Sequence, residues 1–300
     1  LKRFKENGYP GLANMSKRPH EHSQQLTEKQ ICDVIHLKKE FMEFGPKKIH
    51  NLYNRSHNID ISLSSVSRIL KRSGFTKTYK KRRANPLEHK AMILEAKSPN
   101  DIWTIDFKGH WQSSERNKCE PLTIVDQYSR FILYCLPLVK SDGEHVKDVF
   151  VSLFKRYGLP KVIKSDNGPP FAHSLSPRGI TRLSNWIMSL GIDVHRIQPA
   201  KPYQNGKHER MHKDLKALVQ LGPRLSMKEY HGSLKMFQER YNYQRPHEGL
   251  DMKFPSEIYH QSDRKYHEPS KDIDYPKDMF IRRVYKSGEI KYQANLYKIS

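Results

Sequence analysis

Cysteine is scarce in this chain, and long apolar runs are missing. The 300 residues contain three cysteines, Cys32, Cys119 and Cys135, without paired spacing, which argues against a disulfide framework and indicates a reducing compartment. No apolar run reaches the ~18 residues of a membrane span, and no signal peptide is visible at the start. We therefore expect a cytoplasmic protein that does not use a membrane.

Acidic residues are also in short supply. The 54 Lys and Arg residues oppose 32 Asp and Glu residues, which gives a formal net charge of +22 and a pI near 9.8. Basic side chains release counterions from nucleic acid, so this charge favours a polyanionic partner. A ribosomal protein would share the charge, but it would not need the three acidic motifs that follow.

Three acidic residues stand in distinctive contexts. Asp106 and Asp166 each end a run that predicts a β-strand, and Glu209 lies near the start of a predicted helix. Three such carboxylates can hold two divalent cations roughly 3.5–4 Å apart, which clamp the attacking and leaving oxygens of a phosphodiester. We expect two Mg²⁺ ions, with Mn²⁺ able to substitute, and Asp106 as the bridging ligand. The alternative for each of these acids taken alone is a solvated or capping carboxylate. For Asp126, which we do not expect to bind metal, we predict a turn or an ion pair with Arg130.

The N-terminal part predicts three short helices. Residues 26–44 and 47–53 show helical spacing, Ser62 caps the third helix, and Gly74 ends it. Three short helices with a tight connection between the second and the third form a helix-turn-helix. The outer side of the third helix either contacts a DNA major groove or is a solvated face. Its candidate DNA-binding residues are Ser64, Ser65, Arg68 and Lys71.

A basic run without apolar periodicity follows over about residues 76–99. It predicts a linker that tracks a phosphate backbone, with a solvated tether as the alternative. The candidate DNA-binding residues of this linker are Lys80, Lys81, Arg82 and Arg83.

Residues 100–221 predict one α/β domain. Three strands joined by short connections, which imply antiparallel neighbours, are followed by helix, strand, helix, strand and helix. This order is the ribonuclease-H-like plan, a mixed five-stranded sheet with flanking helices. The helix of Glu209 carries basic residues that would either bind phosphates or form i,i+4 pairs: Lys207, Arg210, Lys213 and Lys216. For His208 and His212, which flank Glu209, we expect DNA contact or packing rather than proton transfer.

The predicted domains follow from these patterns. They are a helix-turn-helix (1–75), the basic linker (76–99), the ribonuclease-H-like core (100–221), a helical and Pro-rich extension (222–270) and a small β-module (271–300). The chain opens at Leu1 and stops at Ser300 inside a predicted strand. We therefore expect that the natural protein extends beyond both ends.

Four ordered motifs and a later signature give the chain a family resemblance. The motifs at 105–106, 122–130, 165–169 and 203–210 resemble the retroviral-integrase-type catalytic core of bacterial insertion-sequence transposases. The stretches 241–250 and 255–259 resemble the post-core signature of the same group. The resemblance covers nearly the whole chain, from the helix-turn-helix to the terminal β-module.

The resemblance implies an Asp-Asp-Glu recombinase. It would bind the terminal inverted repeats of a mobile element in double-stranded DNA, cleave there, and join the freed 3′-hydroxyls to target DNA as a homo-oligomer on paired ends. A nucleoid-associated protein of a prokaryotic cytoplasm is expected. Asp106, Asp166 and Glu209 match the metal ligands of the family, although the interval from Asp166 to Glu209 is longer than in retroviral integrases.

Two other functions remain open at this point. A nuclease or resolvase with the same core would cut DNA without joining it. A non-enzymatic DNA-binding protein, a retired transposase, would keep only the helix-turn-helix. The three intact acids, Asp106, Asp166 and Glu209, argue against the second alternative.

Overall fold

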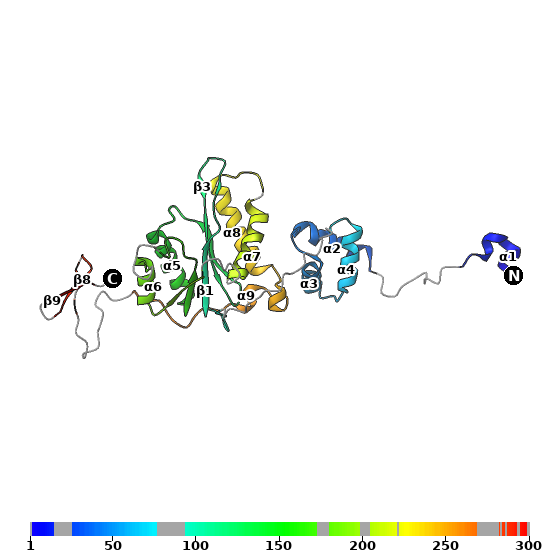
Figure 1. Cartoon of the computed structure of the whole chain (residues 1–300). Coiled ribbons are helices and arrows are strands. Elements are labelled where there is room, and N and C mark those ends of the chain that lie inside the picture. Colours follow the sequence, from blue (N-terminus) through cyan, green and yellow to red (C-terminus); the bar gives the residue numbers. More distant parts are fainter. Residues whose placement is uncertain are drawn as a thin grey trace. The chain divides into compact units, whose positions relative to one another are not determined.

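A computed structural model gives the structure of the chain (Figure 1). It describes residues 2–14, 26–76, 94–172, 180–198, 205–220, 222–268, 282, 284–285, 287–292 and 295–298. The chain divides into two compact units, Leu1–Arg82 and Arg83–Ser300. Among the described residues, no helix has the length and apolarity needed to cross a membrane.

The first unit contains a cluster of three helices. They are α2 (Glu28–Glu40), α3 (Pro46–His57) and α4 (Leu63–Arg72), after a short α1 (Lys2–Asn7) and η1 (Tyr9–Leu12). Thr27 and Gln30 form a capping box on α2, and the Ser62 hydroxyl accepts the Ser65 N–H at the start of α4. Gly74 follows α4 with a φ of 74°. The apolar sides of the three helices share one core, so the predicted N-terminal helices are confirmed.

A five-stranded mixed sheet forms the centre of the second unit. Its strands are β1 (Ile102–Phe107), β4 (Pro121–Asp126), β5 (Ile132–Pro137), β6 (Val162–Ser165) and β7 (Asp193–Arg196). They lie in the order β5-β4-β1-β6-β7, with β4 antiparallel to both neighbours and β6 parallel to β1 and β7. This sheet confirms the predicted ribonuclease-H-like fold. A hairpin of β2 (Trp111–Gln112) and β3 (Lys118–Cys119) was not predicted.

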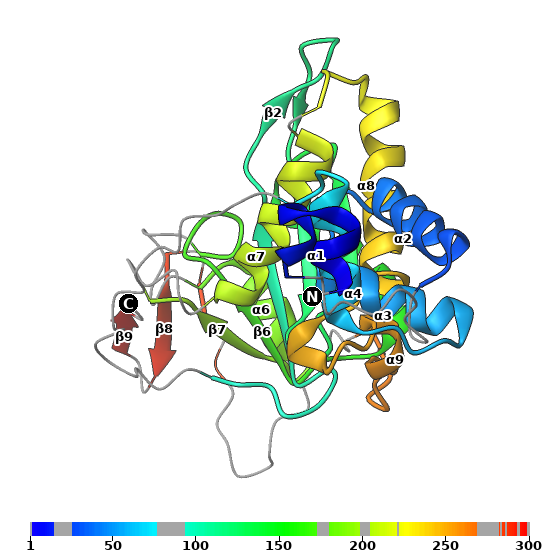
Figure 2. The same ribbon diagram turned by 90° about the vertical axis from the view of Figure 1, so that its right-hand side faces the viewer.

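Helices cover both faces of this sheet (Figures 1 and 2). One face packs against α5 (Gly143–Tyr157) and α6 (Arg182–Ser189), the other against α7 (Gly206–Leu215) and α8 (Met227–Tyr243). Side chains alternate along β1. Trp103 and Ile105 join the core with α5 and α6, whereas Thr104 and Asp106 face α7. The strand thus brings polar groups to the face that α7 covers.

The chain after α8 returns to the sheet and its helices. It contains η5 (Glu248–Leu250) and α9 (Pro255–Ile258). The Ser262 N–H donates to the Tyr157 carbonyl, and the Leu159 N–H donates to the Arg264 carbonyl. The Arg264 guanidinium also donates to the Gly191 carbonyl at 2.6 Å. We call residues 255–266 the strap, because these bonds hold it across the ends of α5 and α6.

The edge strand β5 is paired with a side chain of α8. The Asn242 Oδ1 accepts the Ile132 N–H at 2.8 Å, and its Nδ2 donates to the Ile132 carbonyl at 2.9 Å. Gln238 donates a second hydrogen bond to the same carbonyl. The backbone N–H and carbonyl of Ile132, a buried residue of an edge strand, therefore both have hydrogen-bond partners.

The last described residues form a hairpin of β8 (Glu289–Tyr292) and β9 (Asn295–Lys298). Before the hairpin, the Gly288 N–H donates to the Tyr285 carbonyl. Residues 271–281 of the predicted β-module lie outside the described residues.

Candidate active site

The three predicted acids come from neighbouring elements. Asp106 lies near the end of β1, and Asp166 directly follows β6, the parallel neighbour of β1. Parallel neighbours end at the same edge of a sheet, so the two carboxylates emerge together. Glu209 lies in the first turn of α7, which packs on the β1 face that Asp106 shares.

The charges of these acids act on one another. Burial, the Asp166 charge and the Glu209 charge together raise the pKa of Asp106 to about 7, against a hydrogen bond from the Phe107 N–H that lowers it. Like charges that must share a site disfavour ionisation. The carboxyl of Asp106 is half-buried, whereas Asp166 and Glu209 are exposed.

The loop after β6 keeps Asp166 in place. The Gly168 N–H donates to the Asp166 Oδ1 at 3.2 Å, and a Cβ at position 168 would lie 3.0 Å from Oδ2. Asn167 donates from Nδ2 to the Ile197 carbonyl beyond β7. Asn167 and Gly168 thereby shape the loop beside Asp166.

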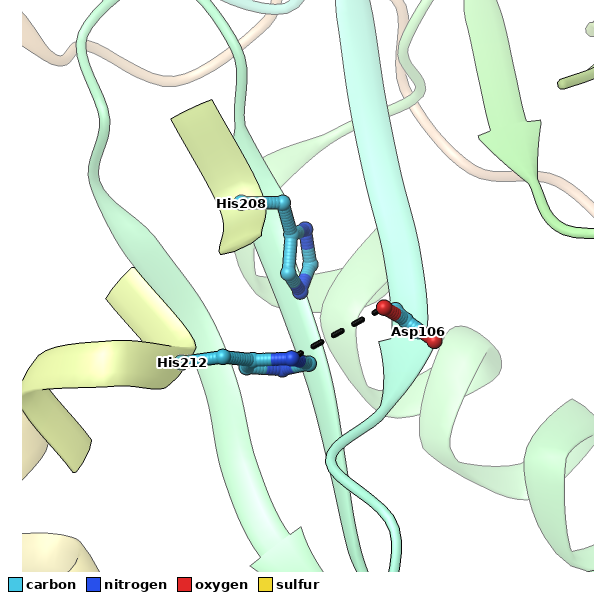
Figure 3. Close-up of side chains that lie close together, drawn as sticks. All are labelled: Asp106, His208 and His212. Atoms are coloured by element: carbon cyan, nitrogen blue, oxygen red, sulfur yellow. Dashed lines mark ion pairs between the residues drawn. The ribbon is translucent and has the colours of Figure 1, made fainter. Parts of the chain in front are cut away.

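Two histidines of α7, His208 and His212, point toward the strand that carries Asp106 (Figure 3). The buried His208 places Nδ1 2.7 Å from the Thr104 Oγ1 and Nε2 2.7 Å from the Thr123 Oγ1. His212 places Nε2 2.7 Å from the same Thr123 Oγ1, while its Nδ1 lies 3.7 Å from the Asp106 Oδ2. Of the two roles expected for these histidines, their positions support packing.

The hydrogen-bond network assigns the proton positions on both rings. Thr123 lies 2.8 Å from the Asp106 carbonyl oxygen, which carries no hydrogen, so the hydroxyl must donate there. Both histidines therefore donate from Nε2 to the Thr123 oxygen. Burial lowers the pKa of His208 well below its usual range and that of His212 to about 3, so both rings are neutral. The His212 Nδ1 then carries a lone pair that faces Asp106.

Asp106, His208 and His212 form a group of possible metal ligands in the described chain, with ligand atoms all within 4.8 Å of one another. Both ring nitrogens of His208 already contact hydroxyls, so His212 is the histidine that can offer a nitrogen. Sequence reasoning did not select His212 as a ligand. Its spacing of three positions from Glu209 and four from His208 was the available signal, because it places the histidines on one helix face.

The predicted basic residues of α7 are exposed: Lys207, Arg210, Lys213 and, at the helix end, Lys216. Arg210 lies 4.0 Å from Asp214, so the alternative of an i,i+4 pair is realised for this residue.

The predicted recognition residues of α4 lie on its outer side. Ser64, Arg68 and Lys71 are exposed, Ser65 is half-buried, and Arg68 donates to the Ser64 carbonyl and the Ser65 hydroxyl. Residues 80–83 of the basic linker, Lys80, Lys81, Arg82 and Arg83, lie outside the described residues.

Asp126 is a turn residue, as predicted. The buried carboxylate accepts the Ser129 N–H and hydroxyl at Oδ1 and the Asn100 N–H at Oδ2. These three bonds join the end of β4 to the turn that follows it and to the residue that precedes β1. Asp126 thereby belongs to the framework of the sheet.

Two protein-family models, each described as an integrase core domain, match the chain over residues 96–202 and 190–255. An uncharacterized 31.7 kDa protein of insertion element IS407 from Burkholderia multivorans is 22% identical, covering 79% of this chain and 82% of the relative. The Gag-Pol polyprotein of baboon endogenous virus is 31% identical, covering 46% of this chain and 8% of the polyprotein. The simian T-cell lymphotropic virus intasome, solved in complex with a PP2A regulatory subunit, is 18% identical, with a TM-score of 0.48 over 81% of this chain and 80% of that chain.

The ribonuclease-H-like sheet and the matched ranges, which together run from 96 to 255, define an integrase-type core domain. This domain implies polynucleotidyl transferase activity. With its insertion-element relatives, the chain belongs to the bacterial insertion-sequence transposases that have a retroviral-integrase-type core, a family of DNA transposition and integration.

Proposed function

We propose that this transposase binds the ends of a mobile element, cleaves phosphodiester bonds there, and joins the freed 3′-hydroxyls to target DNA. Asp106, Asp166 and Glu209 are its proposed catalytic residues. The observation that carries the proposal is that the parallel neighbours β1 and β6 bring Asp106 and Asp166 to one edge of the sheet, with Glu209 in the first turn of α7. Burial and the charges of the other two acids raise the pKa of Asp106 to about 7. The charges of two acids from other elements therefore act on Asp106, which supports the proposal of one shared site.

The residues present fit divalent cations. Like charges that repel in a half-buried site are offset by a bound cation, and carboxylate oxygens are the ligands that Mg²⁺ prefers. Asp106, Asp166 and Glu209 would hold two Mg²⁺ ions, with Mn²⁺ able to substitute. When bound, such ions supply charge neutralisation at the phosphodiester oxygens and a lower pKa for the attacking water or 3′-hydroxyl.

The chain itself would bind and orient the DNA. Exposed cations of α7, Lys207, Arg210, Lys213 and Lys216, extend from the turn of Glu209 along the helix and would contact phosphates near the scissile bond. In the first unit, α4 would enter a major groove with Ser64, Ser65, Arg68 and Lys71. The proposed substrate is double-stranded DNA, both terminal inverted repeats and target, bound by a homo-oligomer on paired ends.

A joining assay tests this proposal. The protein is incubated with the flanking DNA of its own element, a supercoiled target plasmid and Mg²⁺ or Mn²⁺, alongside Glu209→Gln. Glu239→Gln, at an exposed position of α8, is the matched control. We expect joined products from the wild type and from Glu239→Gln, and none from Glu209→Gln.

Other outcomes select the other functions. Cleavage without joining would identify a nuclease, and tight DNA binding without chemistry in any of the proteins would identify a DNA-binding protein. Equal joining by Glu209→Gln and the wild type would remove Glu209 from the proposed site.

A further inference from the structure

We infer that His212 supplies a nitrogen ligand to a divalent cation held by Asp106, so that this site binds transition-metal ions such as Mn²⁺ more tightly than carboxylates alone would. The inference rests on the proposed function, because Asp106 is one of the proposed metal ligands. It adds a ligand of a different chemical kind to the three acids.

The distance between the two side chains suits a cation between them. The His212 Nδ1 and the Asp106 Oδ2 are 3.7 Å apart, longer than an N–H···O hydrogen bond of about 2.7–3.2 Å. Metal–nitrogen and metal–oxygen bonds to such ligands are each about 2.0–2.2 Å. The Asp106 Oδ2 and the His212 Nδ1 would therefore hold one such ion between them.

The lone pairs of the two side chains converge. With the His212 proton on Nε2, the unprotonated Nδ1 faces a carboxylate oxygen, which is also an acceptor. When Asp106 is ionised, two acceptors face each other at this distance and repel unless a proton or a cation lies between them. The neutral imidazole is also the form that binds metals.

Thr123 fixes the ring in the orientation that a ligand needs. A metal-bound histidine usually donates its other ring N–H to a nearby oxygen, which sets the tautomer. Here the acceptor is the Thr123 hydroxyl, which donates in turn to the Asp106 carbonyl. His208 braces the same hydroxyl from the other side. The Asp106 side chain, 26% exposed, leaves the pair reachable from solvent.

The donor set predicts a selectivity. Mg²⁺ is bound mainly through carboxylates and retained waters, whereas imidazole nitrogen favours transition metals. Removing the His212 nitrogen should therefore weaken Mn²⁺ binding and leave Mg²⁺ binding nearly unchanged. A purely structural histidine would weaken both together.

Electron paramagnetic resonance of bound Mn²⁺ tests the inference. His212→Gln keeps an amide that reaches toward Thr123 but lacks the Nδ1 ligand, and His231→Gln on the exposed side of α8 is the control. We expect hyperfine coupling to ¹⁴N in the wild type and the control, replaced by ¹⁵N coupling after ¹⁵N-histidine labelling. In His212→Gln the coupling should vanish, and the Mn²⁺ dissociation constant should rise about 10-fold or more, with Mg²⁺ affinity from competition changed less than about threefold.

The outcomes separate the two proposals. Mn²⁺ that is released by Asp106→Asn but shows no nitrogen coupling in the wild type would overturn the role of His212 and leave the three-acid site standing. An absence of any Mn²⁺ bound at Asp106 would overturn both. If His212→Gln fails to fold, the ¹⁵N-labelled wild type still decides, because it needs no variant.

Discussion

Arg245 and Asp214 form an ion pair in which the arginine Nη2 lies 2.6 Å from the aspartate Oδ2. Asp214 is in the last turn of α7, the helix of Glu209, and Arg245 follows α8 in the post-core signature. The Arg245 guanidinium also lies over the Tyr241 ring, 5.5 Å from its centroid. The pair therefore ties α7 to the post-core segment.

Arg245→Met should lower the free energy of unfolding by about 3 kcal/mol, because it leaves the largely buried Asp214 carboxylate with only the exposed Arg210, 4.0 Å away, as a cationic partner. Urea denaturation measures the change. Lys118→Met, which breaks the more exposed ion pair with Glu120, is the control and should cost less than about 1 kcal/mol. Equal losses in the two variants would show that the Arg245 pair is worth no more than a surface contact.

Asp106→Asn should change how stability depends on pH in metal-free buffer. The pKa of Asp106 is raised from 3.8 to about 7 in the folded chain, so the stability that its protonated form contributes is fully present below pH 3.8 and lost as pH rises through about 7. Asn resembles the protonated carboxyl and does not titrate. The free energy of unfolding of the variant should therefore rise relative to that of the wild type by about 1.4 kcal/mol per pH unit between pH 3.8 and about 7.

Unfolding measured at several pH values with a chelator present gives this difference directly. A difference that stays constant between pH 4 and 8 would mean that neither burial nor the other two acids raise the pKa of Asp106 in the folded chain. Asp142→Asn is a useful contrast. Asp142 is an exposed helix cap, and hydrogen bonds with His145 lower the pKa of its carboxyl below 3.8. The effect of this substitution on the pH dependence of stability should therefore have the opposite sign.

Gly158→Ala should destabilise the second unit and loosen the strap. The glycine has a φ of 79°, and a Cβ there would lie 2.6 Å from the Ser262 carbonyl oxygen and 2.9 Å from that of Arg264. Backbone strain and displacement of the strap should together cost about 2–4 kcal/mol. Gly232→Ala, in α8 with open space around the glycine, should instead raise the free energy of unfolding by about 0.5–1 kcal/mol. Losses of the same size in both variants would contradict this account.

The three cysteines should differ in reactivity. Cys32 is exposed, whereas Cys119 and Cys135 are buried, and burial raises the pKa of Cys119 to about 11 and that of Cys135 further. Titration of the native protein at pH 8 with an aromatic disulfide reagent should modify one thiol per chain, and three after denaturation. Native Cys32→Ser should not react; rapid modification of a second native thiol would refute the burial of the sheet cysteines.

Local signals made most helices and strands predictable. Thr27, Ser62 and Asp142 cap helices as their sequences indicate, since a cap depends on residues three positions away. The strands around Asp106 and before Asp166 followed from short apolar runs. The hairpin of β2 and β3 was missed, because strands of two residues are too short to show alternation.

Long-range contacts account for the features that the sequence did not predict. His208 and His212 could be placed near Glu209, but their shared acceptor, Thr123, is 85 and 89 positions away. The strap bonds Ser262 and Arg264 to residues about a hundred positions earlier. No periodicity encodes such pairs, because they depend on strand register and on how helices pack. The roles of Asp106, Asp166 and Glu209 remain predictions that the joining assay would test.

Asn242 has a consequence for how copies of this protein could assemble. Its amide occupies, at Ile132, the two hydrogen-bonding positions that an added strand would need. An open sheet margin is a template for pairing with another chain, and proteins often protect it. Here the Asn242 side-chain amide makes the two hydrogen bonds that a peptide group of an added strand would make with Ile132. Subunits that meet on paired DNA ends would therefore not associate by adding a strand to β5 at Ile132.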